Sequence, residues 1–533
     1  MDYFKNEERF KNLVEIPKDI SHLLKDEMLL ISGDFYGIQK FIFDRLSTKN
    51  ASKVLRAKSA YIQIFTEYLA RYICSELEIT ENAILSMNAG KFEILSSKMD
   101  IDLNAIQKRV DDFFVKNFYG LSGVVISSVE CQGDDFKSTE KYKALRKKII
   151  DSVEDRKFQK FNLFRDDAYD VLSYDTNLDN SSLCPICNIR KVGSENEHCS
   201  ICDGFINLGQ RLAKDSDEIL SSAELGIHFI DNFNPKIKLD SRIKSYILYV
   251  EDKGVNVPAD FKRLADNACS QIETGIKSLA ILKADVDNMG KFLEKSDVTG
   301  SFESFDSFSK TIDNFFSLYI PTLMRKKYPN TYTVFAGGDD LFLLGAWDEI
   351  LDLAREIERE FKAFVTEDAK ALTISFGIAI AKPSTPISYL ADHSEHLLEE
   401  AKGIDNEKEV EHPKDALSLF GETVKWSDYL EVYNHLYSSL ESFEEHLNTA
   451  FLYRLLELIE MSKKVKYAND IASTMWKSKF RYSFNRNILE KMKNSNDNKR
   501  AEEMLELLGG LIDSNPKETK MVVNEFIYKR RES

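Results

Sequence analysis

Two strand-like apolar runs in this sequence are each accompanied by aspartates, whose carboxylates can bind metal ions and take part in catalysis. The runs cover residues 279–282 and 335–344, and the residues of interest around their ends are Asp285, Asp287, Gly337, Gly338, Asp339 and Asp340. Neighbouring strands lie about 4.8 Å apart, so carboxylates at two strand ends can share a pair of Mg²⁺ or Mn²⁺ ions. Two such ions clamp an in-line displacement at phosphorus, and glycines let the backbone approach a phosphate. Taken alone, Gly-Gly-Asp-Asp also fits an ordinary hairpin turn.

An internal repeat supports the catalytic interpretation. Residues 34–41 align without gaps on residues 285–292, and each copy continues as a helix, a hairpin, a helix and a strand. The hairpin alignment sets Gly90 on Gly338, and so Lys91 and Phe92 on Asp339 and Asp340. The first copy therefore lacks the hairpin carboxylates, although Lys91 could contact a phosphate as a point charge. We predict one catalytic copy and one nucleotide-binding copy; a purely structural first copy is the alternative.

The chain has 533 residues and a net charge of −16, so it is not a generally basic nucleic-acid binder. Its charge is uneven, because residues 463–500 hold 11 Lys and Arg residues against three acids, interleaved with aromatic residues. That mixture suits a surface facing RNA or another subunit of a ribonucleoprotein, but a solvated helix face with core aromatics fits equally well. No apolar run reaches 18 residues and no signal peptide begins the chain, so we expect a cytoplasmic protein without a membrane span.

Four of the seven cysteines have the spacing of a zinc site. They are Cys184, Cys187, Cys199 and Cys202, in two Cys-x-x-Cys pairs separated by 11 residues. Four thiolates complete a tetrahedral Zn²⁺ site and leave no open position, so we predict a structural metal. His198 could replace Cys199, but it sits beside a better-spaced thiolate.

The periodicity predicts an α+β multidomain chain. We expect a lead-in at 1–27, a first repeat at 28–163, a zinc-binding linker at 164–272, a second repeat at 273–426 and a helical region at 427–533.

Taken together, these features resemble the large, polymerase-like subunit of type III CRISPR interference complexes, most closely the Csm-type. Besides the two Cys-x-x-Cys pairs, the matching segments are residues 32–43, 55–59, 88–92, 282–290, 337–340, 375–378 and 400–402. The resemblance covers nearly the whole chain, and the order and spacing of the segments are specific. It implies two ferredoxin-like palm domains of the nucleotide-cyclase type facing each other, a zinc-binding module between them and a C-terminal helical bundle.

The resemblance also implies an activity and its residues. The activity is ATP-dependent synthesis of cyclic oligoadenylates, triggered by target RNA, within a ribonucleoprotein that holds guide RNA and other Csm-type subunits. Asp285, Asp339 and Asp340 would be catalytic and would ligate Mg²⁺ or Mn²⁺, with Asp287 beside them. The implied nucleotide contacts are Gly337, Gly338, Lys402, Arg56, Lys58, Ser59 and Lys91. Of these, Arg56, Lys58 and Ser59 would contact the acceptor ATP, unless they form a solvated helix end. No side chain is an obvious general base, so metal activation of the 3′-hydroxyl is the simpler expectation.

Two departures from the family pattern affect the expected activity. Only 33 residues precede Asp34 and no His-Asp doublet occurs, so we expect no HD-type DNase activity, whether that domain is naturally absent or was removed. The hairpin of the first copy has one glycine where the family usually has two. This difference could alter the acceptor pocket, so the resemblance supports the use of ATP better than it supports a cyclic product. Transfer of AMP to another acceptor, a diguanylate cyclase and a non-enzymatic nucleotide-binding scaffold are the alternatives. Product ring size and the activity of the free chain are not readable from the sequence.

Overall fold

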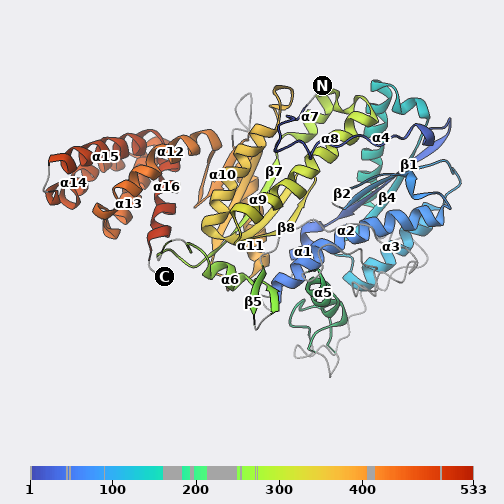
Figure 1. The fold of residues 1–533 in the computed structure, drawn as a ribbon, viewed down its shortest axis with the longest axis horizontal. Helices are drawn as coiled ribbons and strands as arrows, with labels where there is room; N and C mark the ends of the chain where they lie inside the picture. Colours follow the sequence, from blue (N-terminus) through green and yellow to red (C-terminus); the bar gives the residue numbers. More distant parts are fainter. Residues whose placement is uncertain are drawn as a thin grey trace.

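The computed structural model describes residues 3–43, 46, 50–88, 90–159, 183–192, 197–212, 249–252, 255–270, 272, 274–404, 414–492 and 495–531. Figure 1 shows two sheets with their helices side by side and a group of helices at one end. The mixture of strands and helices confirms the α+β class. Much of the predicted zinc-binding linker, including residues 213–248, lies outside the described residues. Within the described residues, no helix is both long enough and apolar enough to cross a membrane.

The first repeat forms a four-stranded antiparallel sheet in the order β2-β3-β1-β4. Its elements are β1 (Met28–Tyr36), α1 (Ile38–Phe43), α2 (Ala51–Glu76), β2 (Ile84–Asn88), β3 (Lys91–Ser96), α3 (Leu103–Phe118), β4 (Gly123–Cys131) and α4 (Thr139–Phe158). Helices α2 and α3 contact the sheet and share one apolar core with it. Helix α4 contacts β1 and β4 and packs over a second, smaller core.

The second repeat forms a six-stranded sheet in the order β12-β11-β10-β7-β9-β8. Its elements are β7 (Leu279–Val286), α7 (Met289–Lys295), α8 (Phe302–Asn314), α9 (Ile320–Lys327), β8 (Thr331–Gly337), β9 (Asp340–Ala346), α10 (Trp347–Phe364), β10 (Ile374–Ala381), α11 (Ile387–Gly403), β11 (Ala416–Leu419) and β12 (Glu422–Lys425). Among the described strands of this sheet, only β10 and β11 pair in parallel. Helix α10 contacts β7 and β9, and α11 contacts β7 and β10.

The two repeats share a strand order, and their hairpins carry the same irregularity. The register shifts between Ile84 and Ser86 in the first repeat and between Thr333 and Phe335 in the second. Matching these two bulges equates Asn88 with Gly337 and Lys91 with Asp340. Gly90 therefore corresponds to Asp339, and the sequence alignment of Gly90 with Gly338 was wrong by one residue. A bulge adds a residue to one strand, so it fixes register where glycine spacing does not. The first repeat still lacks both hairpin carboxylates.

The second sheet has two apolar faces, one of which joins the repeats. Ala280, Leu282 and Ala284 of β7 face a core shared with α10, while Leu279 and Ile281 join the core of the first repeat. The ring of Phe43 in α1 packs against that of Phe342 in β9 in a tilted arrangement, with the ring centroids 4.4 Å apart. A fully buried phenylalanine contributes about 1.5–3 kcal/mol. The first repeat is therefore packed directly against the sheet that carries the carboxylates.

Helices alone make up the described C-terminal region after β12. They are α12 (Trp426–Ser442), α13 (Thr449–Ala468), α14 (Trp476–Asn487), α15 (Ser495–Ser514) and α16 (Pro516–Arg530). Arg355 of α10 pairs with Glu525 of α16 at 2.9 Å, in a contact that is buried on both sides. This pair joins the helices to the second repeat. The segment before β1 also packs on the second repeat, where Phe4 stacks on Phe364 at 4.5 Å.

Between the repeats, the described elements are α5 (Ser200–Arg211), β5 (Tyr249–Asp252), β6 (Val255–Pro258) and α6 (Phe261–Asp266). Helix α5 lies against α2 of the first repeat, and α6 contacts β7 and β9 of the second.

Candidate active site

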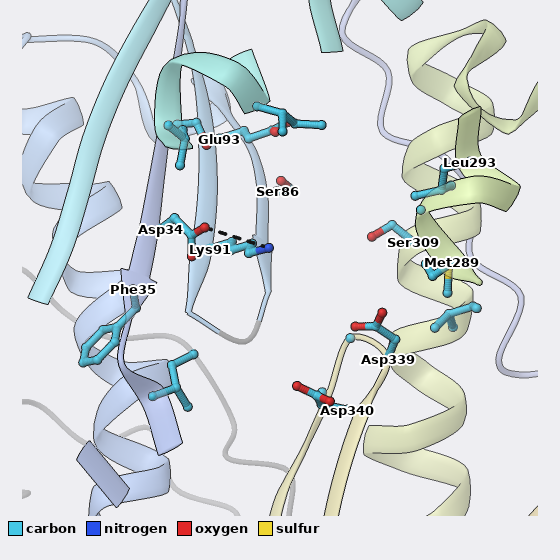
Figure 2. Close-up of a pocket in the computed structure, with 18 of the residues that line it drawn as sticks. Asp34, Phe35, Ser86, Lys91, Glu93, Met289, Leu293, Ser309, Asp339 and Asp340 are labelled. Atoms are coloured by element: carbon cyan, nitrogen blue, oxygen red, sulfur yellow. Dashed lines mark ion pairs between the residues drawn. The ribbon is translucent and has the colours of Figure 1, made fainter. Parts of the chain in front are cut away.

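Strand register brings three of the predicted carboxylates to one edge of the second sheet. Asp285 of β7 lies opposite Asp340, the first residue of β9. The ladder continues one step further, because Val286 N donates to Asp339 O at 3.2 Å. Figure 2 shows Asp339 and Asp340 at the tip of the β8–β9 hairpin. Asp285, Asp339 and Asp340 therefore share one edge.

A carboxylate from a distant helix supports the turn of this hairpin. Gly338 has φ +65°, a left-handed conformation that glycine adopts without strain. Its N–H donates to Asp313 Oδ1 at 2.8 Å, and Asp313 lies in the last turn of α8. Asp313 precedes a π-helical turn over Phe315–Tyr319, a feature often found at functional sites. Sequence reasoning missed Asp313 because nothing local links it to a turn 25 residues away.

The two hairpin carboxylates lie in an environment that disfavours their negative charge. Burial raises the pKa of Asp339. Burial also raises the pKa of Asp340, and repulsion from Asp339 adds to that increase. A bound cation would remove both penalties, and carboxylate oxygens are the ligands that Mg²⁺ and Mn²⁺ prefer. The donor set therefore fits hard divalent cations.

Two lysines lie close to the same edge. Lys402, in the last turn of α11, is ion-paired with Asp285, and Lys283 of β7 is ion-paired with Glu395 of α11. Burial lowers the pKa of each lysine to about 8. Helix α11 can lie this near because β10 has Gly377, where a Cβ would stand 2.3 Å from Leu398 N. Lys283 and Glu395 were not predicted from the sequence.

The pair between Lys402 and Asp285 affects how the carboxylates are spaced. Among the described residues, only the four cysteines bring three or more candidate ligand atoms within 4.8 Å of one another. The three aspartates do not converge that closely, and Oδ2 of Asp285 is ion-paired with Lys402. A cation at Asp285 would therefore compete with Lys402 for the charge of this carboxylate.

Asp287 lies on the other side of β7, away from the hairpin. It is fully buried, and its Oδ2 accepts hydrogen bonds from Thr373 Oγ1, Ser375 Oγ and Asp415 N at 2.8–3.0 Å. Burial raises its pKa. These bonds tie β7 to β10 and to the start of β11, which is a structural role. Asp287 therefore lies apart from the edge that Asp285, Asp339 and Asp340 share, and its predicted role as a metal ligand stays a prediction.

A cavity of about 1420 Å³ separates the hairpin from the first repeat. Gly337, Gly338, Asp339 and Asp340 line one wall together with residues of α7 and α8, and residues of β1, β3 and α4 line the other. Figure 2 shows Asp34 and Lys91 facing the hairpin across this space. Asp285 and Lys402 are not among the lining residues, although Lys283 of the same strand is. The volume is ample for nucleotides.

The first repeat keeps one feature of the carboxylate edge and lacks another. Asp34 of β1 lies opposite Lys91, as Asp285 lies opposite Asp340. Lys157, in the last turn of α4, pairs with Asp34 at 2.8 Å, as Lys402 of α11 pairs with Asp285. The strand-to-helix ion pair is therefore present in both repeats. The hairpin carboxylates are present only in the second.

The three residues predicted to contact an acceptor ATP lie on α2, and none of them lines this cavity. Arg56 is buried, donates to Gly209 O of α5 at 2.5 Å and lies 5.6 Å from the ring centroid of Tyr332. The ammonium of Lys58 lies 5.7 Å from the ring centroid of Phe41. Ser59 is half-buried on the same helix. Arg56 thus joins α2, α5 and β8 instead of facing the nucleotide cavity.

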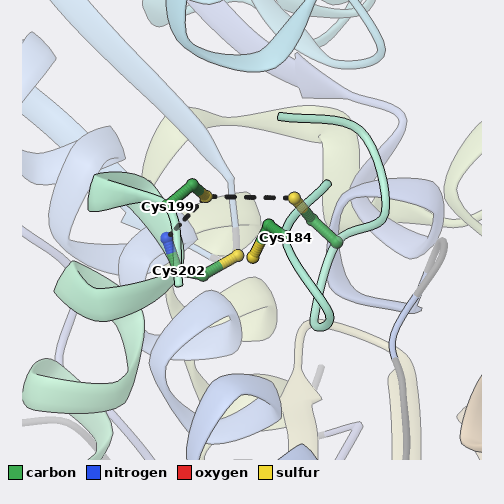
Figure 3. A group of neighbouring side chains, drawn as sticks. Cys184, Cys199 and Cys202 are labelled. Carbon is green, nitrogen blue, oxygen red and sulfur yellow. Dashed lines mark hydrogen bonds between the residues drawn. The ribbon is translucent and has the colours of Figure 1, made fainter. Parts of the chain in front are cut away.

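The four predicted cysteine ligands come together, and Figure 3 shows Cys184, Cys199 and Cys202 of this group. Their sulfurs all lie within 4.8 Å of one another, and Cys187 Sγ is 3.9 Å from Cys199 Sγ. Sulfurs on a tetrahedral zinc with bonds of about 2.3 Å would be about 3.8 Å apart, so the cluster fits Zn²⁺. Cys199 is also the N-cap of α5. His198 is not a member of the cluster and contacts Asp203 at 3.1 Å.

The basic segment of the C-terminal helices offers fewer exposed aromatic rings than its sequence predicts. Trp476, Phe480 and Phe484 are buried in the core, and only Tyr467 and Tyr482 are exposed. Basic residues remain on the surface of α14 and α15. The solvated-face interpretation therefore holds for most of this segment.

Comparison with known proteins places both repeats in one family. Residues 278–411 match the family model of the second palm domain of Cas10/Cmr2, and residues 27–174 match that of Csm1 subunit domain B. A Cas10/Csm1 protein of Methanocaldococcus jannaschii, named a single-strand-specific deoxyribonuclease of subtype III-A, is 27% identical over 84% of this chain and 64% of its own. The Enterococcus italicus protein of the same name is 27% identical over 83% of this chain and 61% of its own.

The fold is also that of solved structures. Csm1 of T. onnurineus superposes with a TM-score of 0.65 at 21% identity, over 95% of this chain and 70% of its own. A Csm1–Csm4 cassette in complex with AMPPNP gives a TM-score of 0.64 at 20% identity, over 94% and 70%. The chain spans less than two thirds of the length of the curated relatives it matches. Two family models on the two repeats, together with these relatives, show that the chain belongs to the Cas10/Csm1 family of type III CRISPR systems.

Proposed function

We propose that this chain synthesises cyclic oligoadenylates from ATP, as the large subunit of a type III-A CRISPR ribonucleoprotein activated by target RNA. The observation that carries this proposal is the edge formed by Asp285, Asp339 and Asp340, of which Asp339 and Asp340 line a cavity large enough for two nucleotides. The proposed organisation is two palm domains, a zinc-binding module between them and a C-terminal helical domain. Solved structures of this fold include cassettes in complex with AMPPNP, pppApA, cA3 and cA4.

In the proposed site, Asp285, Asp339 and Asp340 hold two divalent cations, and Asp313 keeps the turn that presents the last two. When bound, Mg²⁺ or Mn²⁺ would neutralise phosphate charge and lower the pKa of the acceptor hydroxyl. Lys402 would leave Asp285 and turn to the donor triphosphate, whose charge it can neutralise at short range. Gly337 and Gly338 keep the hairpin free of side chains where the phosphates approach.

The chemical step joins two nucleotides. The 3′-oxygen of the acceptor forms a bond to the α-phosphorus of the donor, and the bond from that phosphorus to the α,β-bridging oxygen breaks. Pyrophosphate leaves, and the proton of the 3′-hydroxyl passes to solvent. Repetition lengthens the chain, and the same step between its own 3′-hydroxyl and its own 5′ α-phosphorus closes a ring.

The test uses the complex assembled with guide RNA and supplied with labelled ATP and Mg²⁺ or Mn²⁺, with and without target RNA. Mass spectrometry identifies the products, and GTP replaces ATP in a parallel reaction. We expect cyclic adenylates only with target RNA, with no product from Asp339→Ala/Asp340→Ala. Asp392→Asn is the matched control, because Asp392 is exposed on α11 and outside the cavity.

Each other outcome identifies a different function. If the wild-type complex did not convert ATP, the result would indicate that the chain is a nucleotide-binding scaffold. A non-cyclic adenylyl product would point to another acceptor, and preferential use of GTP would point to a guanylate cyclase. The deoxyribonuclease activity in the names of the relatives is not part of this proposal.

A further inference from the structure

The segment before β1 runs along helix α8 of the second repeat. Asn314 Nδ2 donates to Leu13 O at 3.1 Å, and Glu15 N donates to Thr311 Oγ1 at 3.2 Å. Ser307 Oγ donates to Glu15 O at 2.8 Å. These bonds follow α8 from its last turn toward its first, so the segment lies antiparallel to the helix and is fixed on it.

Lys18 carries this segment from the second repeat to the first. Its backbone N–H donates to Asp306 Oδ2 of α8 at 2.9 Å. Its ammonium donates to two backbone oxygens of the first repeat, Asn82 O at 2.9 Å and Ile84 O at 2.6 Å. Two residues later, Ile20 is buried in the smaller core of the first repeat. One half-buried lysine therefore makes hydrogen bonds to both repeats.

The strand that Lys18 contacts is the one that its own sheet holds least. Strand β2 is at the edge of the first sheet, where it has a neighbour on one side. Its register shifts between Ile84 and Ser86, and a β-bulge leaves backbone groups without a partner in the ladder. Buried backbone oxygens need donors, and a lysine ammonium offers three. Lys18 therefore fixes the bulge at the base of the β2–β3 hairpin.

On the second repeat, the same contact leads to the β8–β9 hairpin. Asp306 and Asp313 are two turns apart on α8, so they lie on one face, about 10 Å apart along the helix axis. Asp306 accepts from the backbone N–H of Lys18, and Asp313 accepts from Gly338 N at the turn of the hairpin. The two hairpins are therefore joined through Lys18 and one short length of helix.

Both ends of this connection reach the cavity. Ser86 of β2 lines it, as do Asp306 and Ser309 of α8, and Figure 2 shows Ser86 and Ser309 on opposite sides. The repeats also meet through the apolar core that includes residues of α1 and β9, but apolar attraction is not directional. Hydrogen bonds have narrow ranges of length and angle. Those of Lys18 can therefore set the separation of the two walls.

A second lysine bridges the repeats at a different element. Lys143 of α4 donates to Glu294 O and Ser296 O of the second repeat, at 3.3 and 3.0 Å. This contact holds α4, whereas Lys18 holds β2 at the other end of the strand order. Loss of Lys18 should therefore release the β2–β3 hairpin while α4 stays in place.

We propose that Lys18 is a positioning residue, which holds the β2–β3 hairpin at a fixed separation from α8 and so aligns the two walls of the cavity for adenylyl transfer. The inference rests on the proposed function, because joining two nucleotides in one cavity requires their reacting atoms to be aligned. Lys18 does not line the cavity, so it acts through the hairpin and not by contact with a nucleotide.

The first measurement uses the RNA-activated complex with labelled ATP and Mg²⁺, and gives kcat and KM for ATP. Lys18→Met removes the ammonium and keeps most of the side-chain length, while Asp306 keeps its bonds from the backbone N–H and from Lys310. Lys18→Arg keeps a cation with several donors. Lys11→Met is the matched control, because Lys11 is an exposed lysine of the same segment whose ion pair with Glu8, at 3.8 Å, lies on the surface.

The second measurement reports the separation itself. Nitroxide labels on Met87→Cys of β2 and Glu303→Cys of α8 give a distance distribution by pulsed electron–electron double resonance on the full chain. Both positions are exposed and outside the cavity lining. The native cysteines are buried or belong to the cysteine cluster, so the labels attach to the introduced ones.

We expect Lys18→Met to lower kcat about tenfold or more and to leave KM within about threefold, because misalignment affects the chemical step more than binding. Lys18→Arg should recover most of kcat, and Lys11→Met should match wild type. The distance distribution should broaden in Lys18→Met and stay narrow in the other two variants. The Tm of each variant shows that the chain is folded under the conditions of both measurements.

Three results would overturn the inference. Lys18→Met could retain the kcat of wild type, it could lose kcat without a change in the label distances, or Lys18→Arg could be as impaired as Lys18→Met. In each case wild type still forms adenylates, so the proposed function stands. If wild type formed no adenylates, the proposed function itself would be contradicted, and the label distances would still show whether Lys18 sets the separation.

Discussion

The two repeats of this chain have the same scaffold and different chemistry at the tip of the hairpin. Both sheets place an aspartate of the central strand opposite the first residue of the hairpin's second strand, as Asp34 with Lys91 and as Asp285 with Asp340. Both also pair that aspartate with a lysine from the helix that follows the fourth strand of the repeat, which is β4 in the first and β10 in the second. At the hairpin the two repeats differ in charge, because Gly90 and Lys91 stand where the second repeat has Asp339 and Asp340.

That difference shows how few residues decide the role of each repeat. In the first repeat Lys157 and Lys91 offset the charge of Asp34, so no excess of negative charge remains to attract a cation. In the second repeat Asp339 and Asp340 form a pair whose pKa values are raised by burial and, for Asp340, by mutual repulsion. The backbone is common to both, and function resides in the site built on it.

The largest expected effect comes from making the second repeat resemble the first. Asp339→Asn/Asp340→Asn should lower the rate of adenylyl transfer by about 10³-fold or more, because loss of the metal ligands removes several kcal/mol of transition-state stabilisation. The measurement is product formed per unit time in the activated complex. Asp392→Asn should retain full activity, and a reduction below tenfold in the double variant would show that the hairpin carboxylates are not the metal ligands.

A smaller effect is expected from substituting Lys402, whose counterpart in the first repeat is Lys157. Lys402→Ala should lower kcat/KM for ATP about 10- to 100-fold, because the donor triphosphate loses a charge-assisted contact. Lys402→Arg should restore part of the activity. The control is Lys382→Ala, since Lys382 is an exposed lysine of the same repeat. If Lys402→Ala were as active as wild type, Lys402 would not contact the donor triphosphate, and its role would be limited to the ion pair with Asp285.

The close approach of α11 provides a third test. Gly377→Ala would place a Cβ 2.3 Å from Leu398 N and 2.4 Å from Ser394 O, which forces α11 away from β10. Such overpacking costs about 1–3 kcal/mol, and it should lower activity because α11 carries Lys402. Chemical unfolding measures the loss of stability.

The first repeat explains why this glycine matters. Its equivalent of Gly377 is Ser127, whose side chain contacts Ser152 of α4 at 2.5 Å, so α4 tolerates a side chain there. Gly510→Ala is the control for the Gly377 variant, because no atom lies within 4 Å of the added methyl group. Unchanged stability of Gly377→Ala would show that α11 can shift freely.

The smallest expected effect is a pH dependence of stability without divalent cations. Asp339 and Asp340 have raised pKa values in the folded state, so their protonation favours folding. Their contribution is present below about pH 4 and is lost as the pH rises through the raised pKa values. The Tm of wild type should therefore fall relative to that of Asp339→Asn/Asp340→Asn between about pH 4 and pH 7. Adding Mg²⁺ at pH 7 should raise the Tm of wild type and not that of the double variant. If Tm changed with pH in the same way for both proteins, Asp339 and Asp340 would not be the groups that cause this pH dependence.

The sequence predicted the features that depend on local patterns. The strand-like runs that end in Asp285, Asp339 and Asp340 and the spacing of the four cysteines are readable from the order of residues, and the structure brings each group together. The repeat was visible because both copies keep the same strand and helix periodicity. These signals lie within a few residues of the groups they predict.

The features that the sequence did not reveal depend on contacts between distant segments. Asp313 supports the Gly338 turn from another helix, and the pair Lys283–Glu395 joins a strand to a helix more than 100 residues later. Arg56 is another example, because its hydrogen-bond acceptor lies on α5, 153 residues later in the chain. The one-residue error in the hairpin alignment arose because glycines were matched, whereas a β-bulge sets the register.

The central claim is that the second repeat binds the catalytic cations and the first does not. The most direct test is to locate Mn²⁺ by anomalous diffraction in crystals of the complex soaked with Mn²⁺ and a non-hydrolysable ATP analogue. The account predicts two Mn²⁺ ions at Asp285, Asp339 and Asp340, with Lys402 moved from Asp285, and no Mn²⁺ at Asp34. Mn²⁺ at Asp34, or none at the hairpin of the second repeat, would contradict it.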